Sequence, residues 1–186
     1  YYLSLEKKIF ENTPLIIANS NMVKNEIINY YGISENKITV IHNGVDVKRF
    51  SPKNKTELRH KYNLPEDARI ILFVGSGFKR KGLDTLIRAR ALLREHETLL
   101  IVIGKGDEKK YKKLCSKLGI ENKVLFWGIK KEIENFYALS DIFVLPTIYD
   151  PFSNATLEAM AAGLPVITTN NNGASELIEK GKEGYL

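Results

Sequence analysis

The sequence has a single cysteine, Cys115, and no long hydrophobic run. One cysteine excludes an internal disulfide and is typical of proteins that work in a reducing cytoplasm. The longest uninterrupted apolar runs have about five residues, as in "LLIVI", whereas a membrane-spanning helix needs roughly 20. These absences, together with 44% hydrophobic and 27% charged residues, predict a soluble cytoplasmic protein of one or two globular domains.

Metal-ligand spacing, repeats and a leader segment are also missing. The histidines, His42, His60 and His96, are scattered, so we interpret them as surface or packing residues and expect no metal site. No basic-then-apolar leader stands at the start, and the chain begins at Tyr1 rather than at a methionine. We therefore expect both ends to be cut from a longer protein.

The charge balance is basic, with 28 Lys and Arg against 22 acidic residues and a net charge of +6. This favours an anionic partner: a phosphorylated small molecule, nucleic acid or an anionic membrane surface. In "EKKYKKLCSKLGI", one helical stripe carries Tyr111, Leu114, Cys115 and Leu118, and lysines occupy the rest. We interpret Cys115 as a core residue and the lysines as a solvated face, with contact to a membrane or acidic partner as the alternative.

Short apolar runs alternate with amphipathic segments from residue 69 onward. The runs are rich in Val, Ile, Leu and Phe, which is typical of strands buried on both faces of a parallel sheet. They are "RIILFVG", "TLLIVIG", "KVLFWG", "DIFVLP" and "PVITT", with helical patterns over about 82–95, 108–119, 131–139 and 153–162. This alternation predicts an α/β fold with a doubly wound, Rossmann-like parallel sheet, whose ligands bind beyond the carboxyl ends of the strands.

The first 68 residues have a different pattern. The strand "PLIIANS" precedes the helix "NMVKNEIINYYG", which Ser20 or Asn21 caps and Gly32 ends, and "KITVIHNGVD" is a second strand. The polar stretch that follows, with two prolines, suits a connector containing one short helix. We expect a boundary near residues 44 to 50 and three parts: 1–44, the connector 45–68 and 69–186.

One loop of the predicted sheet, "GSGFKRKG", is basic and glycine-rich. Its position between a strand and a helix suits an anion, because main-chain amides and the helix dipole point toward the bound charge. It is not a Walker A loop, since Gly82 is followed by Leu83 and Asp84, and its glycine spacing does not fit the dinucleotide fingerprint. The loop therefore suits a diphosphate, with a solvated basic turn as the alternative.

A second loop leads into the segment "YDPFSNATLEAMAAGLPVI", which carries Asp150 and Glu158. Asp150 is predicted to cap a helix that begins near Phe152 or Ser153. Eight helical positions span at most roughly 12 Å, about the reach from a ribose across a diphosphate to a hexose. A nucleotide-diphosphate sugar would explain both carboxylates; a capping Asp150 and a solvent-facing Glu158 are the alternative.

The chain also resembles a known family. An acidic residue, seven others and then Glu before "AMAAGLPVI" is similar to the E-x7-E motif of retaining glycosyltransferases with the GT-B fold, in family four (glycosyl transferases group 1). The similarity extends through "ANSNMVKNEIINYYGISENKITVIHNGVDVKRFSP", "FVGSGFKRKGLDTLIRA", "VIGKGDEKKYKKL" and "VLFWGIKKEIENFYALSDIFVLPTIYDPF". The stretches "RKG" and "YDPFSNATLEA" most resemble the lipopolysaccharide core glucosyltransferase branch.

The resemblance implies a role for individual residues. Glu158 would bind the ribose hydroxyls, Asp150 would hold the transferred sugar, and Lys81 would neutralise the diphosphate together with Arg80. The remaining donor-binding positions are the phosphate-binding segment Phe152, Ser153, Asn154, Ala155 and Thr156, the base-binding turn Gly128 and Ile129, and the loop residues Gly75, Ser76, Gly77 and Gly104. This chain departs from the family twice, with Asp150 where most relatives have Glu and Ser76 where many have Arg.

The resemblance also implies an activity: metal-independent, retaining transfer of a hexose, with no cofactor, from a nucleotide sugar (UDP-linked by preference) to a glycan, lipid or lipopolysaccharide acceptor. Residues 1–44 would be the final elements of the acceptor domain and 69–186 the truncated donor domain, so we expect this chain alone to be inactive. A nucleotide-sugar epimerase of similar shape and a basic nucleic-acid-binding module are the alternatives. The lysine-rich helix lacks the interleaved aromatics that single-strand binding needs.

Overall fold

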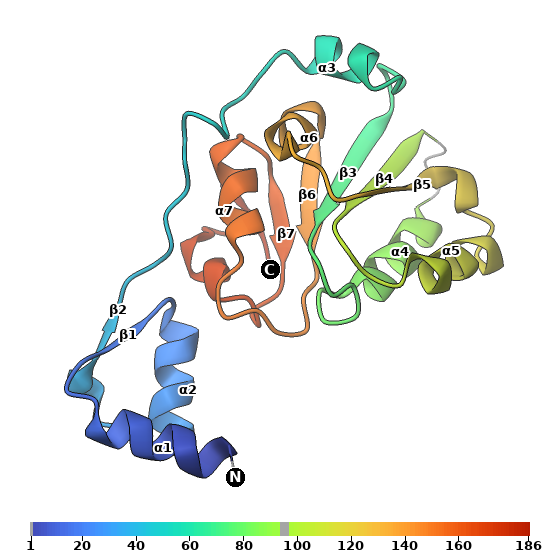
Figure 1. The fold of residues 1–186 in the computed structure, drawn as a ribbon. Coiled ribbons are helices and arrows are strands. Elements are labelled where there is room, and N and C mark those ends of the chain that lie inside the picture. The colour runs from blue at the N-terminus through green and yellow to red at the C-terminus, as the bar shows by residue number, and fades with distance from the viewer. Residues whose placement is uncertain (1, 94–96) are drawn as a thin grey trace.

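The computed structural model describes residues 2–93 and 97–186, and it contains two sheets with separate cores (Figure 1). His96 and the end of the helix predicted over 82–95 lie outside the described residues. A small unit at the N-terminal end holds a two-stranded sheet, and a larger unit holds a six-stranded sheet.

The small unit is built from two helices and two parallel strands, α1 (Tyr2–Asn12), β1 (Ile16–Ala18), α2 (Asn21–Tyr31) and β2 (Ile38–Val40), with a 3₁₀ turn over Glu35–Lys37. Ser20 caps α2 by accepting a hydrogen bond from Val23 N, and Gly32 ends it in the left-handed conformation with φ of 68°. Both ends of this helix were predicted, because a hydroxyl satisfies a first-turn amide and glycine adopts positive φ without strain.

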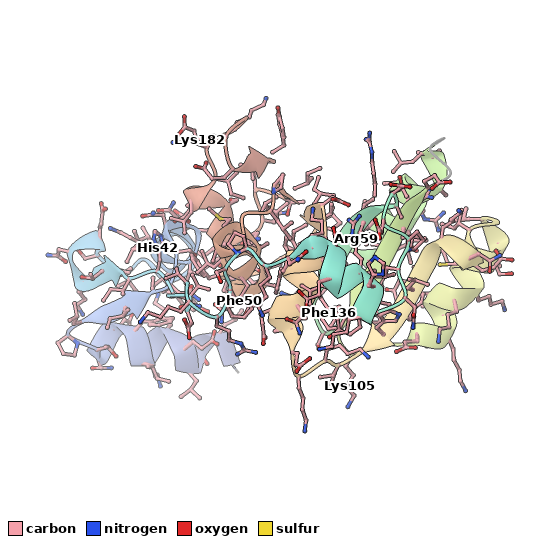
Figure 2. The ribbon with its side chains drawn as sticks, turned by 90° about the horizontal axis from the view of Figure 1, so that it is seen from above. His42, Phe50, Arg59, Lys105, Phe136 and Lys182 are labelled. Atoms are coloured by element: carbon pink, nitrogen blue, oxygen red, sulfur yellow. The ribbon has the colours of Figure 1, made fainter. Side chains whose placement is uncertain are left out.

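The connector contains the predicted short helix, α3 (Lys55–Lys61), but it is more than a polar linker. Phe50 and Leu64 are buried in the core of the larger unit. Arg59 is only 5% exposed, and its guanidinium donates to Asp141 Oδ2 at 2.7 Å and to the Leu139 carbonyl at 3.0 Å. The connector is therefore packed against the larger unit by apolar and charged contacts (Figure 2).

The six-stranded sheet confirms the predicted fold class. Its order is β5-β4-β3-β6-β7-β8, and every neighbouring pair is parallel. The strands are β3 (Arg69–Val74), β4 (Thr98–Ile103), β5 (Val124–Gly128), β6 (Ile142–Leu145), β7 (Val166–Thr168) and β8 (Gly184–Tyr185). The chain builds outward from β3 in one direction and then from β6 in the other. The β3–β6 boundary is thus the switch point at which such sheets form a crevice.

Helices flank this sheet in two groups. They are α4 (Leu83–Leu92), α5 (Glu108–Lys117), α6 (Ile133–Leu139) and α7 (Asn154–Ala161), with short 3₁₀ segments at η2 (Glu121–Lys123) and η3 (Gly173–Leu177). Helices α4 and α5 pack together, with α4 against β6, and α6 and α7 pack together, with α6 against β3 and α7 against β6 and β7 (Figure 1). Cys115 is 1% exposed on the apolar stripe of α5, which confirms its interpretation as a core residue.

Candidate functional site

The loops after β3 and β6 meet at the switch point of the sheet. The Arg80 carbonyl accepts hydrogen bonds from Ile148 N at 2.8 Å and from Thr147 Oγ1 at 3.0 Å. Gly82 follows with φ of 75°, and a Cβ there would lie 1.8 Å from the Pro146 carbonyl oxygen. Only glycine permits this approach, so the basic loop is held directly against the segment that carries Asp150.

The loops after β3 and β4 are also joined, which brings together four predicted residues. Gly77 N donates to the Lys105 carbonyl at 2.9 Å, and Ser76 Oγ accepts from Lys105 N at 3.2 Å. Gly104 has φ of 135°, and a Cβ there would lie 2.1 Å from the Gly75 carbonyl oxygen. The glycines therefore allow two turns to pack backbone against backbone.

Lys81 and Asp150 form an ion pair across the β3 and β6 loops. The exposed fractions of their side chains are 12% and 8%. The main chain of Asp150 is fixed as well, since its amide donates to the Asn171 carbonyl at 2.9 Å and its carbonyl accepts from Gly173 N at 2.9 Å. The sequence predicted neither the direct contact between the two side chains nor this burial.

The predicted helix cap was wrong. Ser153, not Asp150, is the N-cap of α7, and its hydroxyl accepts from Thr156 N at 3.4 Å. Asp150 lies instead in an extended bridge with Asn172, while the helix begins at Asn154, close to its predicted start. Its carboxylate is held by Lys81, so the serine three residues later satisfies the first-turn amide.

The first-turn amides are also less available than predicted. Ser153 N donates to Asn172 Oδ1 at 3.1 Å, and Thr156 N is bonded to Ser153. Within the described residues, the amides of Phe152, Asn154 and Ala155 have no hydrogen-bond partner. The site thus offers three main-chain donors to an anion, two of them in the first turn of α7.

Glu158 is half-buried and is held by a side chain that the sequence did not single out. Tyr137 on α6 donates its hydroxyl to Glu158 Oε2 at 2.7 Å. Burial raises the pKa of Glu158, while the Tyr137 hydroxyl and the Arg49 charge lower it in part. Neighbouring Ala159 and Ala162 pack into the core. No spacing rule links Tyr137 or Arg49 to Glu158, because both contacts depend on tertiary packing.

The predicted base-binding turn lies at the end of β5. Gly128 has φ of 63°, and its carbonyl already accepts a hydrogen bond from Gly104 N at 2.9 Å. Ile129 is 73% exposed, and its main-chain groups have no partner among the residues that the structure describes. Of the two positions, Ile129 therefore carries the backbone groups free to bind a ligand.

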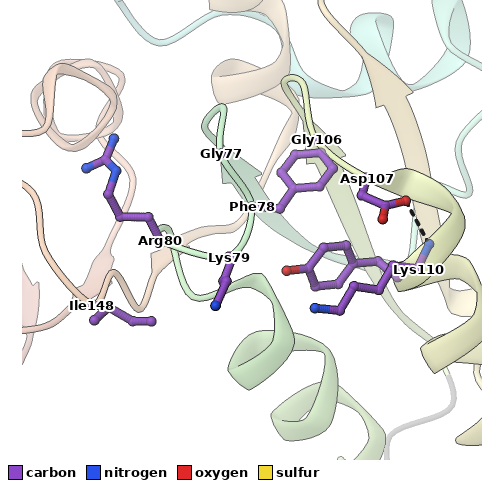
Figure 3. Close-up of a pocket in the computed structure, with 9 residues that line it drawn as sticks. Gly77, Phe78, Lys79, Arg80, Gly106, Asp107, Lys110 and Ile148 are labelled. Atoms are coloured by element: carbon purple, nitrogen blue, oxygen red, sulfur yellow. Dashed lines mark hydrogen bonds between the residues drawn. The ribbon is translucent and has the colours of Figure 1, made fainter.

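The basic loop divides its charges between two sides (Figure 3). Arg80 turns toward the β6 loop, where its Nη1 donates to the Tyr149 carbonyl at 2.8 Å. Lys79 points the other way, and both side chains line a cavity of about 570 Å³ together with Phe78, Lys110 and Tyr111. Arg80 and Lys81 thus contact residues 149 and 150, and Lys79 has no such contact within the described part of the chain.

Residues 2–93 and 97–186 carry neither a metal-binding cluster nor a membrane-spanning helix. They contain no group of three or more His, Cys, Asp or Glu side chains arranged to hold a metal ion. None of their helices combines the length and the apolar character needed to cross a bilayer. His42 and His60 each contact one glutamate, Glu176 and Glu66 respectively.

The chain is similar to known glycosyltransferases in sequence and in fold. Residues 54–186 match the family model "Glycosyl transferases group 1", and residues 1–49 match "Glycosyltransferase Family 4". An uncharacterized glycosyltransferase of Methanocaldococcus jannaschii is 35% identical over 88% of this chain and 44% of its own length. The Escherichia coli lipopolysaccharide glucosyltransferase WaaG is 30% identical over 91% of this chain and 48% of its own.

Among solved structures, an Anabaena protein, HepE, in complex with UDP-glucose has a TM-score of 0.82 and 28% identity, over 93% of this chain and 49% of that one. This chain thus spans about half the length of the relatives it matches.

Proposed function

Because this chain belongs to the group 1 family of glycosyltransferases, with the GT-B fold, we propose that its larger unit binds a nucleotide-diphosphate sugar and presents the sugar for retaining transfer of a hexose. The observation that carries the proposal is the meeting of Lys81 and Asp150 at the switch point of the sheet. A cation for a diphosphate and a carboxylate for sugar hydroxyls lie there beside the open amides of α7.

The Lys81–Asp150 pair leaves hydrogen-bonding capacity for a ligand. The ammonium has three N–H donors and gives one to Asp150, so two remain for phosphate oxygens. The bond is to Asp150 Oδ2, which leaves Oδ1 to accept from a sugar hydroxyl. Positive charge on Lys81 and Arg80, with the amides of Asn154 and Ala155, would stabilise the negative charge that develops on the departing nucleoside diphosphate.

Glu158 suits the ribose. Its Oε2 is held by Tyr137, which fixes the orientation of the carboxylate and leaves Oε1 to accept from a ribose hydroxyl. A half-buried carboxylate loses part of its hydration, and hydroxyl donors would replace that water. Ribose at Glu158 and the sugar at Asp150 place the diphosphate beside the first turn of α7.

We propose a UDP-sugar as the donor, supported by the UDP-glucose complex of the Anabaena relative and by the exposed main-chain groups of Ile129, which suit a base edge. A glycan, lipid or lipopolysaccharide acceptor, metal independence, a cytoplasmic location and peripheral contact with an anionic membrane complete the proposal. Tyr111 is only 2% exposed, so the lysine-rich helix offers no aromatic platform for nucleic acid. We retain neither the epimerase nor the nucleic-acid alternative, because no contact in the site favours either.

A thermal-shift panel tests the proposal. UDP-, GDP- and ADP-glucose are each compared with the corresponding free nucleoside at equal concentration. We expect one diphosphate sugar to raise the unfolding temperature well above its nucleoside, since a ligand that binds only the folded state stabilises it. Equal shifts for sugar nucleotides and nucleosides, or none with any donor, would overturn the assignment.

A further inference from the structure

Glu176, in η3 of the larger unit, binds the first turn of α2 in the small unit. Its Oε2 accepts from Asn21 N at 2.9 Å and from Asn21 Nδ2 at 2.8 Å, and its Oε1 accepts from Met22 N at 2.8 Å. His42 Nε2 lies 3.1 Å from the same carboxylate. One side chain therefore joins the two units through both of its oxygens.

Helix α2 carries no acidic residue of its own in its first turn. A negative charge at that end is favourable because the unpaired amides give a helix N-terminus partial positive charge. Burial raises the pKa of Glu176, but the Asn21 and Met22 amides and His42 outweigh it, so the pKa lies below its usual value. The larger unit thus supplies the capping charge that the sequence of α2 lacks.

The surrounding contacts converge on the segment that carries Asp150. Ser20 Oγ donates to the Pro151 carbonyl at 2.8 Å, and a Cβ on Gly173 would lie 2.0 Å from that oxygen and 2.6 Å from Ser20 Cβ. The His42 ring stacks on Phe152 with centroids 5.4 Å apart.

Two further hydrogen bonds cross the same boundary. Asn43 Nδ2 donates to Asn154 Oδ1 at 2.8 Å, and Tyr149 donates its hydroxyl to Glu26 at 2.7 Å. Residues 149 to 154, with Asp150 among them, are thus bordered by the small unit.

We propose that Glu176 is a positioning residue: by anchoring the first turn of α2, it holds the small unit against residues 149–154 and so fixes Asp150 for the sugar of the donor. The predicted effect on sugar binding rests on the proposed function. The predicted anchoring of α2 depends only on the contacts between the two units, so it can fail independently.

The test compares Glu176→Gln with a matched control, Glu179→Gln. Glutamine keeps the shape of Glu176 but loses the charge and one acceptor oxygen, so its NH₂ group faces main-chain donors. Glu179 also lies near η3, but its side chain is exposed and pairs only with Lys182 within the described residues. Amide hydrogen exchange of the first turn of α2 and calorimetric affinities for UDP and UDP-glucose are measured for the parent and both variants.

For Glu176→Gln we expect exchange at Asn21–Val23 to accelerate about tenfold, and the affinity advantage of UDP-glucose over UDP to fall about threefold to tenfold. UDP itself should weaken by a smaller factor, because Lys81, Glu158 and the Ala155 amide lie outside residues 149–154. Glu179→Gln should match the parent, and Glu176→Asp, which keeps the charge, should recover part of both effects.

Unchanged exchange in Glu176→Gln would overturn the anchoring role. Faster exchange with equal losses for both ligands would overturn the positioning role. A parent that binds UDP-glucose no better than UDP would refute the predicted effect on sugar binding together with the proposed role of Asp150. The exchange result would still show whether Glu176 anchors α2. If Glu176→Gln does not fold, the anchor is judged on Glu176→Asp, for which unchanged exchange would contradict it.

Discussion

Tyr137 donates its hydroxyl to Glu158 at 2.7 Å, joining the buried face of α6 to α7 at the edge of the site. The tyrosine is fully buried, and burial, followed by the charge of Glu158, raises its pKa well above the usual value. It therefore stays protonated and acts as a fixed donor. This bond orients the carboxylate that we assign to the ribose, so the pair is a direct target for mutation.

Replacing Tyr137 with phenylalanine should weaken UDP binding about threefold to tenfold, because the freed carboxylate loses its orientation and one hydrogen bond. Stability should fall by about 1 kcal/mol. Tyr62→Phe is the matched control, since the Tyr62 hydroxyl reaches only the exposed Glu132, at 3.4 Å. Calorimetry with UDP and urea unfolding measure both quantities. An unchanged UDP affinity in Tyr137→Phe would show that this bond does not serve the ligand.

The raised pKa of Glu158 makes a prediction about pH. Its folded pKa lies above the usual 4.5, so the folded state takes up a proton first as pH falls. The contribution of Glu158 to the free energy of unfolding should therefore decrease as pH rises from below 4.5 through the raised pKa. The affinity for uridine should fall as the pH is lowered, and it should begin to fall above pH 4.5. The reason is that the protonated Glu158 carboxyl is a poorer hydrogen-bond acceptor than the carboxylate. Uridine is the right ligand here, since it has no phosphate to titrate.

Glu158→Gln provides the control for this pH dependence. The variant has no ionisable group at the position, so its uridine affinity should be flat over the same interval, and the difference in stability between parent and variant isolates the contribution of Glu158. A parent whose uridine affinity is independent of pH down to 4.5 would contradict ribose recognition by the Glu158 carboxylate.

Replacing Lys81 should lower the stability of the fold, because the buried Asp150 carboxylate then lacks a partner. Lys81→Met leaves a carboxylate that is 8% exposed without its partner, and should destabilise the fold by about 3–5 kcal/mol. The double variant with Asp150→Asn should recover most of that loss. Urea unfolding of both variants and of the parent measures it. Equal stabilities for the single and double variants would mean that the two side chains do not interact in solution.

The phosphate role of the basic loop is tested separately. Two variants are compared with the parent: Arg80→Ala, and Lys81→Met in the Asp150→Asn background. Each should weaken the binding of UDP by about tenfold or more and the binding of uridine hardly at all, because only UDP carries the diphosphate. Lys79→Ala is the control, since Lys79 points away from Arg80, whose guanidinium donates to the Tyr149 carbonyl (Figure 3). Equal losses for UDP and uridine would identify the loop as a solvated basic turn.

Asp141 should be essential to the connector. It accepts from Lys55, Arg59 and Ile70 N at 2.7 to 2.8 Å, so Asp141→Asn should cost about 1–3 kcal/mol. Burial raises its pKa, but these donors lower it below 3.8 on balance, so the stabilisation is present above 3.8 and lost as pH falls through the lower folded value. The exposed Asp67→Asn serves as control, and urea unfolding measures both. A loss of stability below about 0.5 kcal/mol would show that the connector does not depend on these contacts of Asp141.

The sheet and its helices were predictable because their signals are local. Apolar runs, a helical stripe at Cys115 and a glycine stop at Gly32 need only a few neighbouring residues. The failures are at contacts between distant segments. Asp150 and Ser153 are both capable of capping α7. The ion pair with Lys81, 69 positions before Asp150, occupies the Asp150 carboxylate and leaves the cap to Ser153.

The candidate site was predictable in outline only. Lys81 and Asp150 meet at the switch point because they follow neighbouring strands of one parallel sheet, and Glu158 lies on the helix that begins soon after Asp150. Tyr137 and Glu176 were missed, since no periodicity or motif distinguishes a buried hydroxyl or a carboxylate that caps a helix of another unit. The burial of Arg59 was missed as well, because a charged residue in a polar stretch is usually exposed.

The most direct test of the account is titration calorimetry of the parent, Glu158→Gln and Asp150→Asn with UDP and with UDP-glucose, or with the donor that the thermal-shift panel selects. Glu158→Gln should weaken both ligands by about ten- to a hundredfold, since a charged hydrogen bond contributes about 1.5–3 kcal/mol. Asp150→Asn should leave UDP nearly unchanged and remove only the extra affinity that the sugar provides. If folded Glu158→Gln binds UDP as tightly as the parent, or if Asp150→Asn weakens UDP and UDP-glucose equally, the assignment of the two carboxylates is wrong.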